Sequence, residues 1–118
     1  TSEALFQAFF GGVCPGEGFF FCIKISRNIE PSCGVGNFFG LLPENMAGSK
    51  LYGVELDSIT GRIARQLYQN ADIQIKGFEN TDYPDSFFDL AIGNVPFGSY
   101  GVSDQRYAKQ KFHIHDYF

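Results

Sequence analysis

The sequence predicts an α/β fold built on a doubly wound, mostly parallel sheet. Short runs of β-branched and aromatic residues alternate along the chain with segments of helical period. A glycine-rich turn follows the first run, and acidic or amide side chains follow later ones. In such folds ligands bind at the carboxyl ends of the strands, where the strand order reverses. We therefore expect the functional residues in the loops that follow the strands.

The chain is expected to be one domain, residues 1–118, because this length supports a single core that buries roughly two thirds of the unfolded surface. Residues 1–24 are expected to form a short helix, which Ser2 can cap and Gly11 would end, and then a divergent loop. Residues 25–118 are expected to carry the sheet and the functional motifs.

The first core strand is expected near residues 25–29, directly before the glycine-rich turn. A helix is predicted to begin at Asn37 and to reach Leu42, since Pro43 would end or redirect it. The next short apolar run predicts a buried strand at 51–54.

The helix after that strand has a clear start signal. Asp57 is a typical N-cap residue and predicts a helix through Tyr68. Ile59, Ile63 and Leu67 recur at a spacing that puts them on one face of this helix.

Two more strands are predicted. Ile73 and Ile75 alternate with polar residues, which indicates the third strand. A turn around Pro84 and Asp85 precedes the run 88–92, which predicts the fourth. A sheet of four strands leaves an exposed edge, and such edges recruit partners. We therefore expect a homodimer or a higher homo-oligomer.

Composition restricts the function. Thirteen acidic and nine basic side chains give a net charge of −4, so the chain alone should bind the phosphates of DNA poorly. Three cysteines without CxxC spacing argue against a disulfide framework or a zinc site and fit a reducing cytoplasm. No apolar run approaches the roughly 18 residues of a membrane span. His113 and His115 form a pair without further ligands at typical spacing, so no metal is expected.

The most informative motif is NVPF, residues 94–97, which follows the fourth apolar run. A polar amide, a rigid proline and an aromatic ring at the end of a buried strand form a small pocket for a planar amine. Proline keeps the neighbouring carbonyls directed outward, out of the sheet ladder. Phe97 offers a ring face for stacking. The motif predicts group transfer onto nitrogen.

The glycine-rich turn EPSCGVGNF, residues 30–38, precedes Glu55 by about twenty residues, the arrangement that a nucleoside-bearing cofactor needs. Gly34 and Gly36 allow close approach of the backbone and dihedral angles closed to other residues. A dinucleotide fingerprint would place glycine at position 39, where this chain has Phe39. The turn therefore disfavours a dinucleotide.

In that order, EPSCGVGNF, GVELD and NVPF resemble motifs of the amino-methyltransferases that use S-adenosylmethionine. The resemblance is closest to the N6-adenine DNA methyltransferases, whose fourth motif normally has two prolines before an aromatic residue. Residues 30–118 are also similar to the methylase region of large multidomain proteins, often fused to helicase segments, of bacterial conjugative elements and phages. The resemblance implies a Rossmann-like methyltransferase fold, incomplete here at both ends, and a role in DNA methylation of the restriction-modification kind.

The resemblance also implies S-adenosyl-L-methionine as cofactor and two sets of site residues. The expected catalytic residues are Asn94, Val95, Pro96 and Phe97. The expected cofactor-binding residues are Glu30, Pro31, Ser32, Cys33, Gly34, Gly36, Asn37, Phe38, Glu55, Leu56, Phe78, Glu79 and Asn94. Within this set, Glu30 would meet the methionine ammonium and Glu55 the ribose hydroxyls. Phe78 and Glu79 would contact the adenine ring and its amine, and Cys33 would serve packing.

The implied reaction is transfer of a methyl group to the exocyclic N6 amine of adenine. Asn94 Oδ1 and the Val95 carbonyl would each accept an N–H of that amine and stabilise the positive charge that grows on nitrogen. Val95 stands where the family usually has proline. The target base would be flipped out or single-stranded, with Phe97 stacked on it.

Two alternatives stay open. Related motifs serve enzymes that methylate guanine in RNA or glutamine in proteins, and the chain could also be a non-catalytic cofactor-binding or interaction module. DNA is the expected partner, through regions mostly outside this chain, and no membrane contact is expected.

Overall fold

A computed structural model describes residues 13–14, 17–18, 26–42, 44–96 and 101–118. The predicted N-terminal helix, Pro43 and Phe97 lie outside the described residues. The described strands are β1 (Val13–Cys14), β2 (Glu17–Gly18), β3 (Arg27–Glu30), β4 (Lys50–Glu55), β5 (Asp72–Ile75), β6 (Leu90–Ala91), β7 (Gly101–Val102) and β8 (Phe112–His113). The described helices are α3 (Asn37–Gly40), α4 (Ser58–Leu67) and α5 (Ile114–Tyr117), with single 3-10 turns at Glu44–Met46, Phe78–Asn80 and Gln105–Tyr107.

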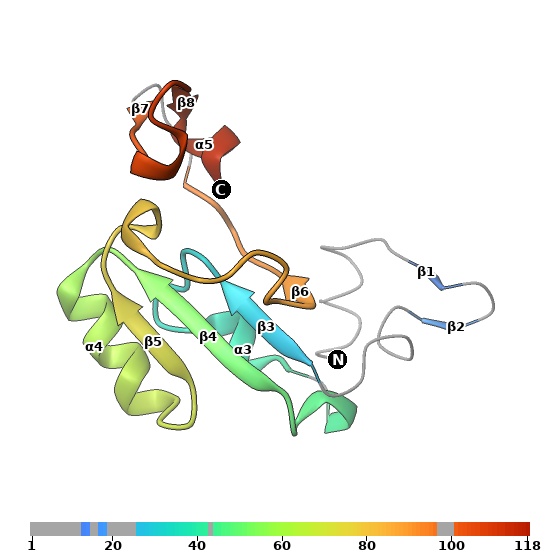
Figure 1. The fold of residues 1–118 in the computed structure, drawn as a ribbon. Coiled ribbons are helices and arrows are strands. Elements are labelled where there is room, and N and C mark those ends of the chain that lie inside the picture. Colours follow the sequence, from blue (N-terminus) through green and yellow to red (C-terminus); the bar gives the residue numbers. More distant parts are fainter. Residues whose placement is uncertain (1–12, 15–16, 19–25, 43, 97–100) are drawn as a thin grey trace.

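The central sheet has the strand order β5-β4-β3-β6, and all its strands are parallel (Figure 1). The chain runs from β3 outward to β4 and β5 and then returns to the other side of β3 as β6. The order therefore reverses between β3 and β6, which is the position where open α/β sheets bind ligands. The predicted fold class is confirmed.

Strand β6 is shorter than the predicted run 88–92. Two hydrogen bonds extend its pairing with β3 by one residue at each end, from Asp89 N to the Arg27 carbonyl (2.8 Å) and from Ile92 N to the Ile29 carbonyl (3.0 Å). Because β6 pairs only with β3 among the described strands, its outer side is an edge of the described sheet.

Helices α3 and α4 pack on the same face of the sheet. Phe39 of α3 and Ala64 of α4 share one buried cluster with Cys33 and Ile73. Phe39 fits close to the strand because β4 has Gly53 opposite it, where a methyl group would lie 3.2 Å from the Phe39 ring. Helix α3 ends at Gly40, two residues earlier than predicted.

Helix α4 begins as predicted, because the Asp57 side chain accepts a hydrogen bond from Thr60 N (2.8 Å). Its buried residues, however, are the small ones, Gly61 and Ala64. The three apolar residues that share a face, Ile59, Ile63 and Leu67, are exposed. The helical period identified the helix but not the face that packs on the sheet.

Aromatic side chains cover the other face of the sheet. Tyr52 points away from α3 and α4, since side chains alternate along a strand and Gly53 faces Phe39. Its ring meets Tyr83, Phe87 and Phe88 edge to face, at centroid distances of 5.2–6.0 Å. Helices α3 and α4 thus cover one face, and the segment before β6 covers the other.

Residues 101–118 form a small group of elements beyond the carboxyl ends of the strands (Figure 1). Strands β7 and β8 pair antiparallel, and α5 follows β8 directly. The group is held together by Asp104, whose buried carboxylate accepts hydrogen bonds from the Arg106 guanidinium (2.8 Å) and from the Tyr117 hydroxyl. These partners hold the pKa of Asp104 well below its usual range. Of the helices in the described ranges, none has the length and hydrophobicity to cross a lipid bilayer.

Candidate active site

The glycine-rich turn after β3 has the backbone that its sequence predicts. Gly34 and Gly36 both have positive φ, +56° and +86°, which side chains disfavour. Around Gly34 there is open space, whereas a methyl group on Gly36 would lie 2.6 Å from the ring of Tyr68. Glycine is therefore required at 34 by the backbone and at 36 by both the backbone and the packing.

Glu55, at the end of β4, fastens this turn to the neighbouring strand. Its Oε2 accepts a hydrogen bond from Gly34 N (2.8 Å), and its Oε1 accepts one from Asp57 N (3.1 Å). A carboxylate has about four acceptor sites. Glu55 can thus hold the turn and still accept hydrogen bonds from a ligand.

Glu30, the last residue of β3, is a buried carboxyl group. It is 2% exposed, and its Oε2 has no hydrogen-bond partner among the described residues. Burial raises the pKa of Glu30 to about 8, and the negative charge of Glu55 contributes to the same effect. Nδ2 of Asn28, two residues earlier on the same strand, is also buried without a partner in the described part of the chain. A buried acceptor of this kind is stabilised by a cation or a donor that reaches it.

Asn94, the first residue of the NVPF motif, lies directly against the glycine-rich turn. Ser32 Oγ donates a hydrogen bond to the Asn94 carbonyl (3.1 Å), which joins residues 62 positions apart in the sequence. Gly93, just before Asn94, is also close to the turn: a methyl group on it would lie 3.7 Å from both Glu30 Cγ and Pro31 Cδ. The first and fourth strands thus bring the two motifs into contact.

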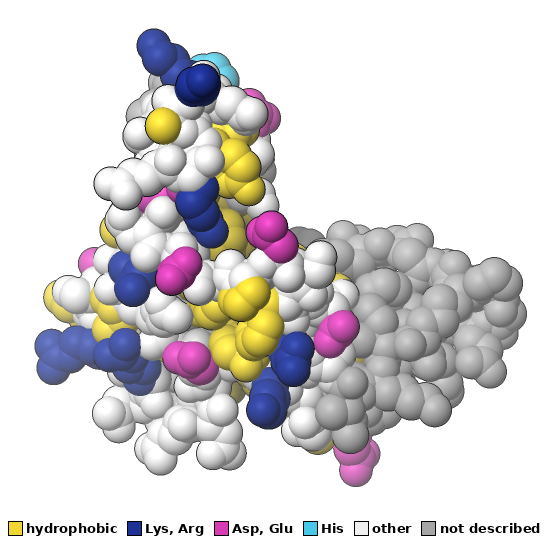
Figure 2. Space-filling model, in the orientation of Figure 1, with side chains coloured by type: hydrophobic (Ala, Val, Ile, Leu, Met, Phe, Trp, Pro, Cys, Tyr) yellow, Lys and Arg dark blue, Asp and Glu magenta, His cyan; other side chains and the backbone are white. Residues whose placement is uncertain are grey.

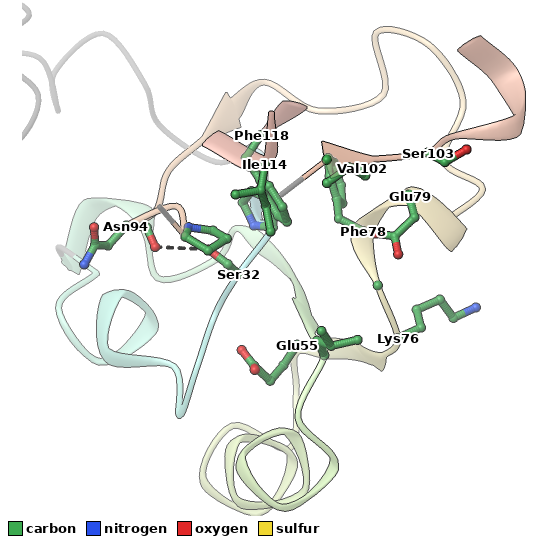
Figure 3. A pocket seen from close by; sticks show the side chains of 15 residues that line it. Ser32, Glu55, Lys76, Phe78, Glu79, Asn94, Val102, Ser103, Ile114 and Phe118 are labelled. Atoms are coloured by element: carbon green, nitrogen blue, oxygen red, sulfur yellow. Dashed lines mark hydrogen bonds between the residues drawn. The ribbon is translucent and has the colours of Figure 1, made fainter. Parts of the chain in front are cut away.

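Asn94 places its backbone, and not its side chain, toward the turn. Figure 3 shows the Asn94 amide turned away from the other labelled side chains, while its carbonyl faces Ser32. The side chain is exposed. An amide in this position can reach a ligand in the cavity only after rotation about its side-chain bonds.

A cavity of about 620 Å³ opens at the carboxyl ends of the four strands. Its lining includes eight of the predicted site residues, which come from all three motifs and from the turn after β5: Pro31, Ser32, Glu55, Leu56, Phe78, Glu79, Asn94 and Pro96. Seven other predicted residues lie outside the lining: Glu30, Cys33, Gly34, Gly36, Asn37, Phe38 and Val95. Phe97 lies outside the described residues. The structure therefore brings the three motifs to one cavity, while the individual roles stay predictions.

Cys33 is part of the core and not of the cavity wall. It is buried against Phe39 and Ala64, and burial, together with the charges of Glu30 and Glu55, raises the pKa of its thiol to about 12. A neutral buried thiol is a poor nucleophile. This environment agrees with the packing role that the resemblance implies.

Sequence reasoning missed two groups of lining residues. Lys76 and Gly77 follow β5 directly, and the rule that ligands lie at strand ends could have identified them. The second group lies in the C-terminal part of the chain and comprises Gly101, Val102, Ser103, Ile114 and Phe118. No local pattern in that part indicates that it returns to the cavity.

The C-terminal group also changes the surroundings of Phe78. The Phe118 ring stacks on Phe78 at a centroid distance of 5.3 Å, and Tyr117 meets it edge-on at 5.8 Å. Figure 3 shows Phe118 and Ile114 above the cavity, between Asn94 and Phe78. Phe78 is available as a cavity wall, but Phe118 already occupies part of its ring face.

Comparisons with known proteins give no matching family model. Among curated proteins, the chain is 36% identical over 76 residues to "Defense against restriction protein B" of Escherichia phage P1, which is 63% of this chain and 3% of that protein. It is also 36% identical over 69 residues to "Type II methyltransferase M.CvrRI" of Paramecium bursaria Chlorella virus XZ-6E, which is 58% of this chain and 18% of that protein. The chain thus spans a small part of the relatives it matches.

Solved structures resemble it over more of its length. A TehB-like SAM-dependent methyltransferase from Corynebacterium glutamicum superimposes with a TM-score of 0.52 and 20% identity, over 79% of this chain and 54% of that one. The chain has the fold of S-adenosylmethionine-dependent methyltransferases. A protein-L-isoaspartate O-methyltransferase shares this methyltransferase fold, with a TM-score of 0.56 and 17% identity over 79% of this chain and 28% of that one. The acceptors of proteins with this fold differ, so the fold leaves the acceptor open.

Proposed function

We propose that the chain binds S-adenosylmethionine and transfers its methyl group to the exocyclic N6 amine of adenine in DNA. The observation that carries this proposal is the hydrogen bond from Ser32 to the Asn94 carbonyl at the edge of the cavity. It places the motif expected to hold the amine beside the turn expected to hold the cofactor. Glu55 lines the same cavity and bonds to the same turn.

The residues present fit this cofactor in charge and in size. Glu55 and Glu79 contribute carboxylates to the cavity wall, and Glu30, which lies outside the lining at the end of β3, carries a buried acceptor without a partner among the described residues. Such a site suits a ligand with an ammonium and a sulfonium group and disfavours a pyrophosphate. The volume of about 620 Å³ lies within the range of small-molecule pockets.

When bound, the cofactor would supply an activated methyl group on a sulfonium. The chain's own part is to position and to stabilise. We expect Glu55 to accept hydrogen bonds from ribose hydroxyls while it holds Gly34, and Phe78 to form an apolar wall for the adenine ring. After rotation, Asn94 Oδ1 would accept one N–H of the acceptor amine and the Val95 carbonyl the other. The Ser32 bond fixes the backbone from which both acceptors project.

DNA as acceptor is supported by the NVPF motif. The curated viral relative is named a type II methyltransferase, which supports methyl transfer as the reaction. RNA guanine and protein glutamine are the competing acceptors for motifs of this kind. A net charge of −4 indicates that this chain contributes little to the binding of nucleic-acid phosphates. We propose that it forms a homo-oligomer through the outer edge of β6.

A non-catalytic module is the second candidate function. Two observations favour it: the Asn94 amide points away from the cavity, and Phe118 stacks on Phe78. The Asn94 side chain would have to rotate, and Phe118 would have to leave Phe78, before an acceptor amine and an adenine ring could be held as proposed.

Calorimetry with S-adenosylmethionine and a methyl-transfer assay test the proposal together. We expect heat of binding, and transfer of labelled methyl from the cofactor to duplex or single-stranded DNA as N6-methyladenine. Asn94→Ala should abolish transfer and leave cofactor affinity nearly unchanged. Asp85→Asn, in an exposed turn, is the matched control. Absence of binding heat supports an interaction module, and binding heat without transfer supports a non-catalytic cofactor-binding module. Methylation of RNA or protein alone would show that the acceptor is not DNA.

A further inference from the structure

Exposed apolar side chains gather on helix α4. The described part of the chain has five exposed large hydrophobic residues, and three of them, Ile59 (67% exposed), Ile63 (46%) and Leu67 (61%), follow one another at four-residue spacing along this helix. We call these three residues the α4 stripe. Leu56, 74% exposed, precedes the helix and also lines the cavity. Single exposed apolar residues are ordinary, but a contiguous row of them marks a contact surface.

The exposure of the stripe follows from close packing on the other side of the helix. A methyl group on Gly61 would lie 2.8 Å from Ile75, and Ala64 is completely buried. Only small residues fit between α4 and the sheet. The helix cannot turn its larger apolar residues inward, so they remain available to a partner.

The stripe lies beside positive charge. A groove along α4 is lined by Ile59, Arg62, Ile63, Arg65, Gln66 and Leu67. Both arginines are exposed, and Arg65 is anchored by a hydrogen bond from Nε to the Ile73 carbonyl (2.9 Å). Neither forms an ion pair with an acidic residue in the described part of the chain. Figure 2 shows basic side chains next to hydrophobic ones at the left edge of the molecule, where Figure 1 places α4.

We propose that the α4 stripe docks an amphipathic helix of a protein partner, whose apolar face is flanked by aspartate or glutamate. The apolar face would cover Ile59, Ile63 and Leu67, and the carboxylates would pair with Arg62 and Arg65. The four-residue spacing matches one face of a helix and favours a helical occupant over an extended one.

The charges favour this occupant over two others. Residues 58–67 contain two arginines and no acidic residue, so two copies of α4 packed together would gather four arginines without a carboxylate. Like charges at such a contact are destabilising. An anionic membrane surface is disfavoured because the whole chain carries a net charge of −4.

The test uses two synthetic fluorescent peptides of about 18 residues, or five helical turns. Both carry leucine at alternating three- and four-residue spacing, and one is flanked by glutamate and the other by lysine. We expect the glutamate peptide to bind the full chain in fluorescence anisotropy and the lysine peptide to bind at least about tenfold more weakly. Ile63→Ser should weaken binding of the glutamate peptide by about tenfold. Tyr107→Ser, at an exposed apolar residue outside α4, should leave the affinity for this peptide unchanged.

Charge reversal makes the result specific. In the variant Arg62→Glu with Arg65→Glu, we expect the preference to invert toward the lysine peptide. All substituted residues are exposed, but Arg65→Glu also removes the hydrogen bond from Arg65 Nε to the Ile73 carbonyl, so circular dichroism must show that the double variant keeps its fold. The proposal is overturned if the glutamate peptide fails to bind at about 1 mM, or if both peptides bind equally. It is also overturned if Ile63→Ser dissolves a homodimer in light scattering, or if α4 binds anionic vesicles in preference to the peptide.

Discussion

The buried carboxyl group of Glu30 should make the stability of the protein depend on pH in an unusual direction. A solvated glutamate has a pKa of about 4.3, whereas burial and the charge of Glu55 raise that of Glu30 to about 8. Between these two values the unfolded chain has lost the proton and the folded chain has kept it. The folded state therefore binds more protons, and its stability falls as pH rises through this window.

The size of the effect follows from the two pKa values. Each pH unit in the window is worth about 1.4 kcal/mol, so ionising Glu30 in the folded protein costs on the order of 5 kcal/mol in total. Between pH 5 and pH 7 the contribution of Glu30 should fall by roughly 3 kcal/mol. This contribution is fully present below pH about 4 and is lost by pH about 8.

Urea unfolding of the native chain and of Glu30→Gln at pH 5, 6 and 7 measures this contribution. The amide imitates the protonated carboxyl and does not titrate, so the difference in unfolding free energy between the two proteins should change with pH by the amount above. Asp85→Asn, in an exposed turn, controls for the loss of one negative charge. If the native chain and Glu30→Gln keep a constant difference across this range, the burial argument for Glu30 is wrong.

The same group should govern cofactor affinity if the proposed function holds. A cation that pairs with Glu30 requires the carboxylate, so binding releases a proton below pH 8 and affinity should rise about tenfold per pH unit between pH 5.5 and 7. Glu30→Gln should flatten that dependence. Calorimetry in buffers of different ionisation enthalpy detects the released proton. If the affinity of the native chain for the cofactor does not change with pH, Glu30 does not pair with the cofactor, and the stability prediction is unaffected.

Two further predictions concern the turn and the C-terminal group. Gly34→Ala should cost about 1 kcal/mol in urea unfolding, from its positive φ alone. Gly36→Ala should cost about 2–4 kcal/mol, because φ is positive there too and the new methyl group meets Tyr68 at 2.6 Å. Equal losses would contradict the packing argument. Asp104→Asn should lower the melting temperature. Burial and the hydrogen bond to Asp104 raise the pKa of Tyr117 to about 12, so ultraviolet titration of this variant should show a lower pKa for Tyr117. An unchanged phenol titration would mean that burial alone sets that pKa. The Asp104 contribution has the opposite sign to that of Glu30: it is present at neutral pH and is lost as pH falls through the lowered pKa.

Local patterns predicted most of the sheet and its turns. The alternation at Ile73 and Ile75, the cap at Asp57 and the glycines of the turn each act within a few residues, and the structure has strand, helix and positive φ there. The boundaries of several elements differ from the prediction. Strand β6, for example, is reduced to Leu90–Ala91, and α3 ends at Gly40.

The sequence by itself determined which segments become strands and helices and which motifs follow them, because these depend on dihedral preferences and on the period of apolar residues. Only the tertiary structure decided that Ser32 meets Asn94 across 62 residues, that residues 101–118 return to the cavity, and that the apolar residues of α4 face outward. It also decided the protonation of Glu30, which depends on burial and on the nearby Glu55. Contacts, burial and local charge are properties of the assembled sheet, and no segment contains them before it is packed against the others.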